Sequence, residues 1–325
     1  MRKSLFSVVL ASALTLGFAA SAQDYPNRQL TMIIPFAAGG PTDVLGRVLA
    51  QRMGEILGQQ VVVENVGGAG GQTGSKRAAD SKPDGYTFVL GTVGTHAQGQ
   101  TLYKKPQYNS LTDFTPVALI ADVPIALIAR KDFPASNLKD FIAYSKANAG
   151  KMTYGSAGAG SATHLGCVVA NMVMDTDITH VPYKGTGPAM QDLQGGRIDF
   201  LCEIVVTALP QIQAGTVKGL ATLSRDRSPV LPDLPTAYEK GFKDLQAYTW
   251  TALLFPKGAP APIVTKMRNA ALTAMNDSGT RAQLQKLGAT IVSPERTTPE
   301  YLGQFVKDEI QKWTGPIQKS GAVPQ

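Results

Sequence analysis

Short apolar segments rich in β-branched residues alternate with segments of helical spacing along most of the chain. In the first third, strands are expected at Leu30–Phe36, Val61–Val66 and Tyr86–Leu90, and a helix at Val44–Leu57 lies between the first two. The apolar residues of this helical segment recur every three to four positions, which places them on one face. Strands separated by helices form a parallel sheet with helices on its faces. The pattern therefore predicts an α/β fold.

Two extended passages interrupt the alternation. The first combines the apolar runs Val117–Ile120 and Ile125–Ala129, which have no helix between them, and the second is Leu245–Phe255. We therefore expect two α/β lobes that are joined by two extended crossover strands. Lobes joined in this way can close around a ligand in the cleft between them. The expected boundaries are residues 23–120 with 246–325 for the first lobe, and residues 121–245 for the second lobe.

The first residues have the pattern of a secretory signal peptide. Two cationic residues precede an apolar stretch from Leu5 to about Ala20, and Ala20-Ser21-Ala22 provides the small residues that signal peptidase recognises. Cleavage is expected before Gln23, so that residues 1–22 form the signal peptide. The stretch is too short for a membrane span, and the alternative is a buried N-terminal helix. We expect an exported, periplasmic protein.

Composition indicates a globular protein and limits the kinds of partner that it can bind. Apolar residues make up 43% of the chain and charged residues 17%, which is typical of a folded chain. The formal net charge is +7, a modest surplus that attracts anionic small molecules at long range. Lysine and arginine are scattered rather than grouped into a basic stripe with aromatic residues, so we expect no nucleic-acid partner. We expect a monomer that needs no cofactor.

The sequence contains two cysteines, Cys167 and Cys202. We expect Cys167 near the start of a helix and Cys202 at the end of a strand in the same lobe, where pairing is feasible. An oxidising compartment permits one disulfide between them. The alternative is a pair of small buried thiols.

The first candidate binding loop connects the Leu30–Phe36 strand to the helix that follows it. Ligands of open α/β sheets bind at the carboxyl ends of strands, and a helix N-terminus there offers unpaired N–H groups and a partial positive charge. Gly39 and Gly40 let the backbone approach a ligand without an intervening Cβ. The alternative is an ordinary turn that Thr42 or Asp43 caps. The candidate ligand-binding residues of this loop are Phe36, Ala37, Ala38, Gly39, Gly40, Pro41 and Thr42.

The second candidate loop, Tyr154–His164, connects a strand to a helix in the second lobe and is also rich in glycine. Its hydroxyl groups can donate to an oxyanion, and its main chain supplies further N–H groups. The alternative is that Ser161 or Thr163 only caps the helix. Two such loops on opposing lobes would hold an anion from both sides. The candidate ligand-binding residues of this loop are Ser156, Gly158, Ser161, Ala162 and Thr163.

Motifs for common catalytic chemistries are incomplete. The glycine-rich run that starts at Gly68 lacks the last glycine of G-x-G-x-x-G, and no G-x-x-x-x-G-K-[ST] phosphate loop occurs. His96, His164 and His180 show no i, i+4 spacing, so we predict no metal site. Ser161 is not part of a G-x-S-x-G motif. We expect no catalytic residues, and a secreted hydrolase that uses Ser161 and His164 remains the alternative.

Short motifs in a fixed order resemble those of the Bug-type periplasmic receptors, which serve tripartite tricarboxylate transporters. These motifs run almost from the expected cleavage site to the C-terminus, and their joint order and spacing are highly specific. The matching stretches are Tyr25-Pro26, Ile34–Asp43, Val63–Gly71, Lys82–Thr87, Asp113–Val117, Gly155–Gly158 with Thr163–Leu165, His180–Gly185 and Leu231–Thr236.

The resemblance implies a type II periplasmic binding fold without catalysis. It also implies capture of a small organic carboxylate, such as a dicarboxylate or an aromatic acid, and delivery to the membrane permease subunits of such a transporter. A sensor kinase that receives the ligand-bound protein is the alternative partner. By the resemblance, the first loop holds the carboxylate largely through main-chain groups and bridging water. Thr92, Thr95 and Glu203 are further residues expected in the cleft.

The sequence departs from the family pattern at two positions. Val66 stands where family members often carry arginine or a similar residue, which makes the turn after Glu64 less polar. Glu203 stands where a shorter acidic or a neutral side chain is common. A glutamate at this position would either disfavour an anion on that side of the cleft or bind an amine or a hydroxyl group.

Overall fold

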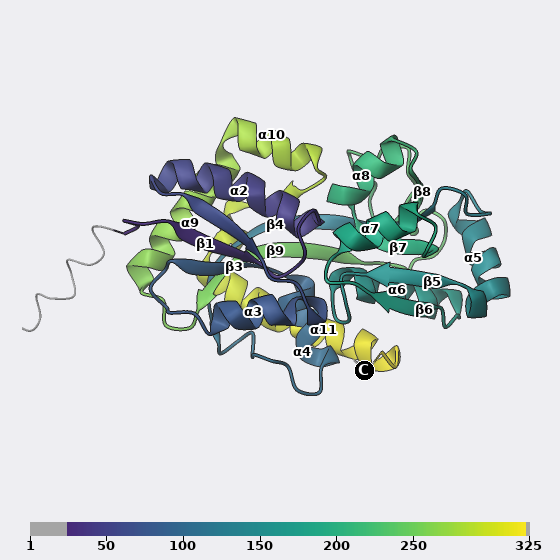
Figure 1. Ribbon diagram of the computed structural model, residues 1–325, viewed down its shortest axis with the longest axis horizontal. Helices are drawn as coiled ribbons and strands as arrows, with labels where there is room; N and C mark the ends of the chain where they lie inside the picture. The colour runs from purple at the N-terminus through teal and green to yellow at the C-terminus, as the bar shows by residue number, and fades with distance from the viewer. Residues whose placement is uncertain (1–24, 323–325) are drawn as a thin grey trace, which may run out of the picture.

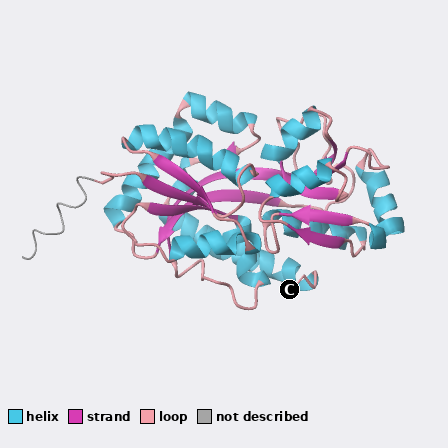
Figure 2. Cartoon of the chain, viewed as in Figure 1, coloured by secondary structure: helices cyan, strands magenta, loops and turns pink. Residues whose placement is uncertain are grey.

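The structure of the protein, a computed structural model, describes residues 25–322 (Figure 1). The signal peptide expected at residues 1–22 and its cleavage before Gln23 lie outside the described residues. Two α/β lobes follow one another along the long axis of the molecule (Figure 1). Helices lie on both faces of the strands in each lobe (Figure 2). The α/β class and the two-lobe architecture predicted from the sequence are confirmed.

The first lobe is built on a sheet in which β1 lies between the parallel neighbours β2 and β3. β3 pairs in turn with β9, in the antiparallel sense. The strands of this lobe are β1 (Leu30–Ile34), β2 (Val61–Asn65), β3 (Thr87–Thr92), β9 (Tyr248–Pro256) and β10 (Thr290–Ile291). Its helices and helical turns are α2 (Pro41–Leu57), η2 (Ala69–Gly71), α3 (Gln72–Ala79), η3 (Gly94–Gln98), α4 (Gly99–Leu102), α9 (Ala261–Asn276), α10 (Ser278–Lys286), η5 (Pro294–Thr297) and α11 (Pro299–Lys319).

The second lobe has the same plan, with β5 between its parallel neighbours β6 and β7. Its strands are β5 (Thr153–Ser156), β6 (Thr179–Pro182), β7 (Phe200–Ile204) and β8 (Val217–Thr222). Its helices and helical turns are α5 (Leu138–Asn148), η4 (Ala149–Lys151), α6 (Ala162–Met174), α7 (Thr186–Gln194) and α8 (Val205–Gln213).

One long strand, β4 (Phe114–Arg130), belongs to both lobes. Its first part, Phe114–Pro124, pairs with β9 of the first lobe, whereas Ile125–Ala129 pairs with β7 of the second lobe. Most of its side chains are buried, because helices of both lobes cover the strand, and a strand buried on both faces has the continuous apolar sequence seen here.

The chain returns to the first lobe through a second extended passage. The N–H of Leu223 donates to the carbonyl oxygen of Ile125 at 2.7 Å, and the N–H of Ala247 donates to that of Leu223 at 2.9 Å. β9 then begins at Tyr248 and runs beside β4. Both predicted extended passages are therefore present as strands that connect the lobes. The boundaries after residue 120 and before residue 246 stay a prediction.

A buried carboxylate attaches the last helix to the first lobe. The Oε2 atom of Glu309 in α11 accepts a hydrogen bond from Trp250 Nε1 at 3.0 Å, and its Oε1 atom accepts one from the Tyr248 hydroxyl at 2.5 Å. Trp250 is fully buried and Glu309 is almost fully buried. Because a buried charge must be hydrogen-bonded to be tolerated, these contacts hold α11 against β9.

Two helices of the second lobe begin earlier than their spacing predicts. The apolar spacing of the sequence predicts helices at Ala189–Gln194 and Leu209–Gln213, and in the structure these helices start at Thr186 and Val205. Glycine, proline and β-branched residues in these first turns have low helix propensity, which hides the helix starts from a pattern search. The helix α5 (Leu138–Asn148) was not predicted at all. The early starts of α7 and α8 matter because they bring two further helix N-termini to the cleft.

The disulfide expected between Cys167 and Cys202 is absent, since both cysteines are free thiols. Cys167 lies in α6 and Cys202 in β7, and each is fully buried in the apolar core. Burial and a hydrogen bond between the two thiols raise the pKa of Cys167. The two side chains therefore pack as small apolar groups, which is the alternative that composition left open.

Within residues 25–322, no helix has both the length and the apolar character that a membrane span requires. The long apolar run at residues 114–130 is the strand β4, buried inside the sheet.

Candidate functional site

The two candidate loops meet across a cavity between the lobes. The first loop runs from β1 to α2 and the second from β5 to α6, so each lies at the carboxyl end of a parallel strand, as expected for ligand sites in such sheets. The cavity is lined by Phe36, Gly40, Pro41, Thr42, Thr92, Ala157, Ser161, Ala162, Thr163, Thr186, Ile204 and Thr249. Of these, Ala157, Thr186, Ile204 and Thr249 were not predicted from the sequence.

Three predicted residues of the first loop lie beside the cavity and have other contacts. The N–H of Ala37 donates to the carbonyl oxygen of Lys184 in the second lobe at 3.0 Å. Ala38 packs against Gly187, where an added Cβ would lie 2.9 Å from the Ala38 carbonyl oxygen. The N–H of Gly39 donates to Asp43 Oδ2 at 3.0 Å. These residues shape the loop and its contact with the second lobe.

Four other predicted residues are buried near the cavity without lining it. Thr95 accepts a hydrogen bond from the Thr92 N–H at 2.8 Å, within a π-helical turn. Gly158 packs against Gly70 of the first lobe. Ser156 and Glu203 are fully buried. Thr95, Gly158 and Glu203 are hydrogen-bonded to the lining residues Thr92, Ser161 and Thr186, and Ser156 accepts the Gly158 N–H.

Four helix N-termini converge on the cavity. Its lining includes the first residues of α2, α6 and α7, which are Pro41, Ala162 and Thr186, together with Ile204, the residue before α8. No side chain caps α2, α7 or α8, so their first N–H groups have no side-chain acceptor. N–H groups at helix starts and the associated partial positive charge suit an anion. Among the described residues, none with a charged side chain lines the cavity.

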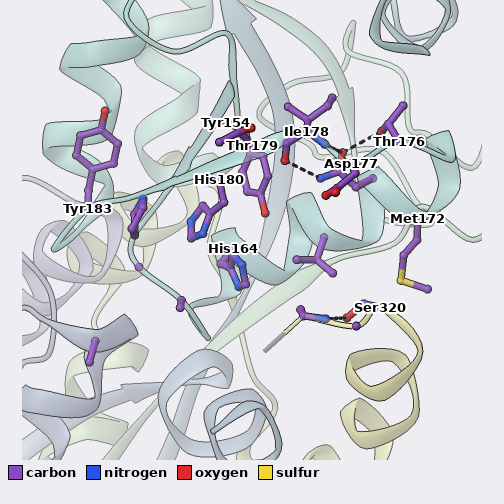
Figure 3. Close-up of a pocket in the computed structure, with 18 of the residues that line it drawn as sticks. Tyr154, His164, Met172, Thr176, Asp177, Ile178, Thr179, His180, Tyr183 and Ser320 are labelled. Atoms are coloured by element: carbon purple, nitrogen blue, oxygen red, sulfur yellow. Dashed lines mark hydrogen bonds between the residues drawn. The ribbon is translucent and has the colours of Figure 1, made fainter. Parts of the chain in front are cut away.

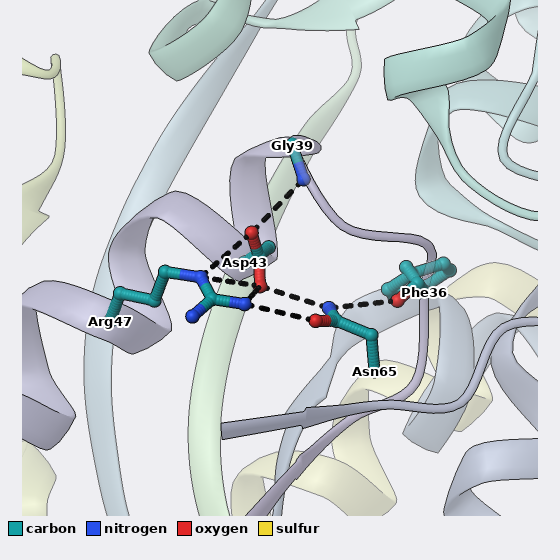
Figure 4. A network of polar contacts seen from close by, with 5 residues as sticks. All are labelled: Phe36, Gly39, Asp43, Arg47 and Asn65. Atoms are coloured by element: carbon teal, nitrogen blue, oxygen red, sulfur yellow. Dashed lines mark hydrogen bonds and ion pairs between the residues drawn. The ribbon is translucent and has the colours of Figure 1, made fainter. Parts of the chain in front are cut away.

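A polar network holds the first loop in shape (Figure 4). The Asp43 carboxylate, on the first turn of α2, accepts the Gly39 N–H at 3.0 Å and Asn65 Nδ2 at 2.9 Å. Asn65 Nδ2 also donates to the carbonyl oxygen of Phe36 at 3.1 Å. Arg47, one turn further along α2, forms an ion pair with Asp43 at 3.0 Å. The end of β2 and the start of α2 thus fix both ends of the loop.

The charge of this network is balanced. Burial by itself would raise the pKa of Asp43, but hydrogen bonds from Arg47, Gly39 and Asn65 lower it below its ordinary value. Asp43 is therefore ionised at neutral pH, and the Arg47 guanidinium compensates its negative charge beside the start of α2.

The second loop is held by its own hydroxyl and imidazole groups. The Ser161 hydroxyl donates to the Gly158 carbonyl oxygen at 2.7 Å and accepts the His164 backbone N–H at 3.2 Å, which caps α6. Ser156 Oγ lies 2.6 Å from His180 Nε2 and accepts the Gly158 N–H at 3.0 Å. Ser161 therefore caps α6 and also lines the cavity, and its contact with a ligand stays a prediction.

The pair that the hydrolase alternative requires is not formed. The hydrogen bonds of the Ser161 hydroxyl go to Gly158, to Thr163 and to the His164 main chain, whereas the His164 imidazole accepts the Gly160 N–H at 3.3 Å. Burial and the nearby His180 lower the pKa of His164 to about 3. This low pKa makes His164 a weak general base.

Glycines allow the two lobes to touch backbone to backbone around the cavity. A Cβ on Gly67 of the first lobe would lie 2.5 Å from the Lys184 carbonyl oxygen, and one on Gly94 would lie 2.8 Å from the Ala162 nitrogen. The hydroxyl of Tyr103 in the first lobe donates to either of two carbonyl oxygens, that of Ala69 at 3.0 Å or that of Ala159 in the second lobe at 2.9 Å. The structure is therefore a closed form, and about 20 Å³ of the cavity is open to the centres of water-sized molecules, room for about one or two waters.

A larger hollow of about 1030 Å³ opens on another side of the contact between the lobes (Figure 3). His164, His180 and Tyr154 lie together in its wall, with the two imidazole rings 4.3 Å apart. Burial lowers the pKa of both histidines, so they are neutral at pH 7. The four helix N-termini converge on the smaller cavity and not on this hollow. Within the described residues, no three His, Cys, Asp or Glu side chains are grouped to hold a metal ion.

Two lobes that close over a cavity of helix N-termini define a periplasmic solute-binding receptor. Residues 45–322 match the family described as the tripartite tricarboxylate transporter family receptor, and the chain belongs to this family.

Similar proteins share nearly the whole chain. The UPF0065 protein in the TAR-I ttuE-ttuC' intergenic region of Agrobacterium vitis is 41% identical over 98% of this chain and 92% of its own length. The solved structure of the periplasmic binding protein BugD has a TM-score of 0.90 and 40% identity, covering 93% of this chain and 100% of its own. MatC of Rhodopseudomonas palustris, solved with bound malate, has a TM-score of 0.87 and 40% identity, covering 90% of this chain and 100% of its own.

Proposed function

We propose that the protein captures a small organic carboxylate by closure of its two lobes and delivers it to the permease of a tripartite tricarboxylate transporter. The observation that carries this proposal is the convergence of four helix N-termini on a cavity without charged side chains. Such a cavity recognises a negative charge through N–H groups that need no counter-ion. Dicarboxylates and aromatic acids are the first candidates, and MatC, which is similar to this chain, is described with bound malate.

The first and second loops would share one carboxylate group of the ligand. Thr42 follows the first residue of α2, and Thr163 follows the first residue of α6, so their N–H groups are among the unpaired donors at the two helix starts. Thr163 Oγ1 also accepts the Ala157 N–H at 3.0 Å, which keeps the second loop beside the cavity. Contacts with both lobes stabilise the closed form when the ligand binds.

Entry of the ligand requires the lobes to open. The space left in the closed cavity holds about one or two water molecules, and the hydrogen bond from Ala37 to Lys184 joins the first loop to the segment between β6 and α7 of the second lobe. A ligand would therefore bind to an open form and leave the same way. We infer export to the periplasm with cleavage before Gln23, and the permease would receive the closed, loaded form.

The proposal is tested by calorimetry on the mature chain with a panel of dicarboxylates and aromatic acids. Binding of at least one acid in the micromolar range or tighter, with a raised unfolding temperature, is the expected result. Thr42→Pro, which removes this main-chain donor in the first turn of α2, should weaken binding, whereas Thr273→Ala, at an exposed threonine on α9, should not. An absence of binding across the panel would overturn the carboxylate assignment.

The partner is tested separately with the ligand that the panel identifies. Membrane vesicles that contain the permease of such a transporter should take up the labelled acid only when the mature protein is added. If uptake does not depend on the protein, but a sensor kinase is activated by its ligand-bound form, the transport part of the proposal fails.

A further inference from the structure

The carboxyl group of Glu203 occupies the space between the N-termini of α7 and α8. Glu203 lies in β7, next to Ile204, which lines the cavity, and its side chain is fully buried. Its Oε1 atom accepts the Thr186 hydroxyl at 2.9 Å and the Thr207 hydroxyl at 2.5 Å. Thr186 is the first residue of α7, and Thr207 lies in the first turn of α8. The protein thus places its own acidic group at two of the four helix starts.

Thr186 lines the cavity and is hydrogen-bonded to Glu203, so it links the Glu203 carboxyl group to the cavity. A threonine hydroxyl has one proton and two lone pairs. Because Thr186 donates its proton to Glu203, its oxygen can only accept a hydrogen bond from a ligand. The side of the cavity at α7 and α8 therefore presents an acceptor, whereas the α2 side presents N–H donors.

A second, independent observation concerns the other carboxyl oxygen. Among the described residues, Glu203 Oε2 has no hydrogen-bond partner although it is fully buried. Buried carboxylate oxygens in proteins normally accept hydrogen bonds. Glu203 does not itself line the cavity, so this oxygen is a second acceptor behind Thr186, and a water that bridges it to a ligand would satisfy it.

We propose that Glu203 and Thr186 select carboxylates that carry a hydroxyl or ammonium group at the end opposite their carboxylate, and disfavour a second carboxylate there. This inference rests on the proposed carboxylate capture and narrows its ligand class. A second ligand carboxylate would face the Thr186 acceptor and, when Glu203 is ionised, a like charge directly behind it. A hydroxyl or ammonium group would donate to the same acceptor.

The charged and titratable groups near Glu203 do not compensate its charge. α8 carries no charged residue, and the charged residue of α7, Asp192, pairs with Arg197 at 2.6 Å. Across the cleft, Asp43 is paired with Arg47, and the Cys167 thiol lies close enough to sense Glu203. Burial raises the pKa of Glu203 to about 7, with hydrogen bonds from Thr207, Thr186 and the Ile204 main chain acting in the opposite direction. The carboxyl group therefore changes charge near neutral pH.

The experiment compares matched acids that differ at one end. The probes are succinate, 4-hydroxybutyrate and 4-aminobutyrate, with the corresponding five-carbon set of glutarate, 5-hydroxypentanoate and 5-aminopentanoate. At pH 8, the hydroxy or amino acid of one set should bind at least about tenfold tighter than the diacid of that set. Lowering the pH to 6 should tighten diacid binding, because Glu203 then takes up a proton.

Glu203→Gln removes the charge without changing the size of the side chain. In this variant, diacid binding should improve about tenfold at pH 8, amino-acid binding should weaken about tenfold, and the pH dependence should disappear. Thr186→Val should reduce the preference for donor groups, and Thr186→Ser should restore it. The two Thr186 variants keep the test valid if Glu203→Gln folds poorly. A purely structural role of Thr186 would not change the order in which the acids bind.

The outcomes separate this inference from the proposed function. If diacids bind the natural protein as tightly as the donor-bearing acids at pH 8, and Glu203→Gln leaves that order unchanged, the selective role of Glu203 and Thr186 is overturned while carboxylate capture stands. If no acid of either set or of the wider panel binds, carboxylate capture itself fails.

Discussion

Ala37 of the first lobe donates its backbone N–H to the carbonyl oxygen of Lys184 in the second lobe at 3.0 Å. The two residues belong to loops on opposite sides of the cavity, and no side chain takes part in the bond. The lobes therefore meet through their main chains. This close contact explains why glycines such as Gly67 and Gly94 lie where the two lobes touch.

Gly67 should be needed for closure. In Gly67→Ala the new Cβ would lie 2.5 Å from the Lys184 carbonyl oxygen and 3.0 Å from the Ala37 nitrogen, so the lobes could not come as close. We expect carboxylate affinity to fall at least about tenfold, with a larger radius of gyration in the presence of ligand, as measured by calorimetry and small-angle scattering. Gly150→Ala, which has nothing within 4 Å of the added carbon, is the matched control. Equal affinity in the two variants would show that closure tolerates a side chain at Gly67.

Asp43 should act on binding through the shape of the first loop. Asp43→Ala leaves the Gly39 N–H and the Asn65 amide without their acceptor. We expect a loss of about 1–3 kcal/mol in the free energy of unfolding and a roughly tenfold weaker carboxylate affinity. Asp80→Ala breaks an exposed ion pair with Lys76 and should change stability by less than about 0.5 kcal/mol. Chemical denaturation and calorimetry measure both quantities, and an Asp43→Ala protein that matches Asp80→Ala would contradict the role of the network.

The histidines should make the fold sensitive to acid. Burial lowers the pKa values of His96 and His164 to about 3 and that of His180 to about 4. These side chains stay neutral in the fold while the unfolded chain takes up protons below about pH 6.5. Their stabilising effect is therefore complete above pH 6.5 and is lost as the pH falls toward 4. Glu203 has the opposite effect on the pH dependence of stability. Its raised pKa of about 7 makes the folded state bind a proton before the unfolded state does, as the pH falls from 7 to 4.5.

The three histidines together affect the pH dependence of stability more than Glu203 does. Between pH 6 and 4.5, the unfolded chain binds about two more protons than the folded chain, and the free energy of unfolding should fall by roughly 1–3 kcal/mol per pH unit. Urea denaturation of the ligand-free protein at several pH values measures this slope. A constant or increasing stability over the same interval would show that the histidines are not buried as neutral groups.

Glu309 should contribute to stability and not to ligand choice. Glu309→Ala removes the acceptor of Trp250 Nε1 and of the Tyr248 hydroxyl in the core of the first lobe. We expect a loss of about 2–4 kcal/mol in the free energy of unfolding, with ligand affinity unchanged in the folded protein. The exposed neighbour Asp308, changed to alanine, is the matched control on the same helix. A selective loss of affinity in Glu309→Ala would place α11 in the binding mechanism.

The strands and most helices follow from the sequence because their apolar spacing reflects which faces are buried. Leu30–Ile34 lies inside the sheet and is apolar except for Thr31, which is only partly buried. The two candidate loops follow from the same logic, since each glycine-rich segment stands between a strand and a helix. Their meeting across a cavity confirms the geometric part of the prediction.

The α7 and α8 side of the cavity could not be predicted in this way. Gly187 and Pro188 lie in the first turn of α7, and Val205 and Val206 begin α8. These residues are poor helix formers, and only packing in the second lobe makes them helical. Thr186 was therefore not recognised as a cavity residue, although Glu203, its hydrogen-bond partner, was.

Contacts between the lobes were also beyond prediction. The bridge from Tyr103 to the carbonyl oxygens of Ala69 and Ala159 depends on how two separately folded units meet. The cysteines illustrate a different limit, because the oxidising compartment favours a disulfide while the core packs Cys167 and Cys202 as free thiols. Spacing along the chain carries no information about either arrangement.

A crystal structure of the mature protein with its bound acid tests the central claim most directly. The account predicts a carboxylate in the cavity between the lobes, with its oxygens at hydrogen-bonding distance, about 2.7–3.2 Å, from main-chain nitrogens at the starts of α2 and α6. A ligand found in the larger hollow beside His164 and His180, or held by charged side chains elsewhere, would contradict the account.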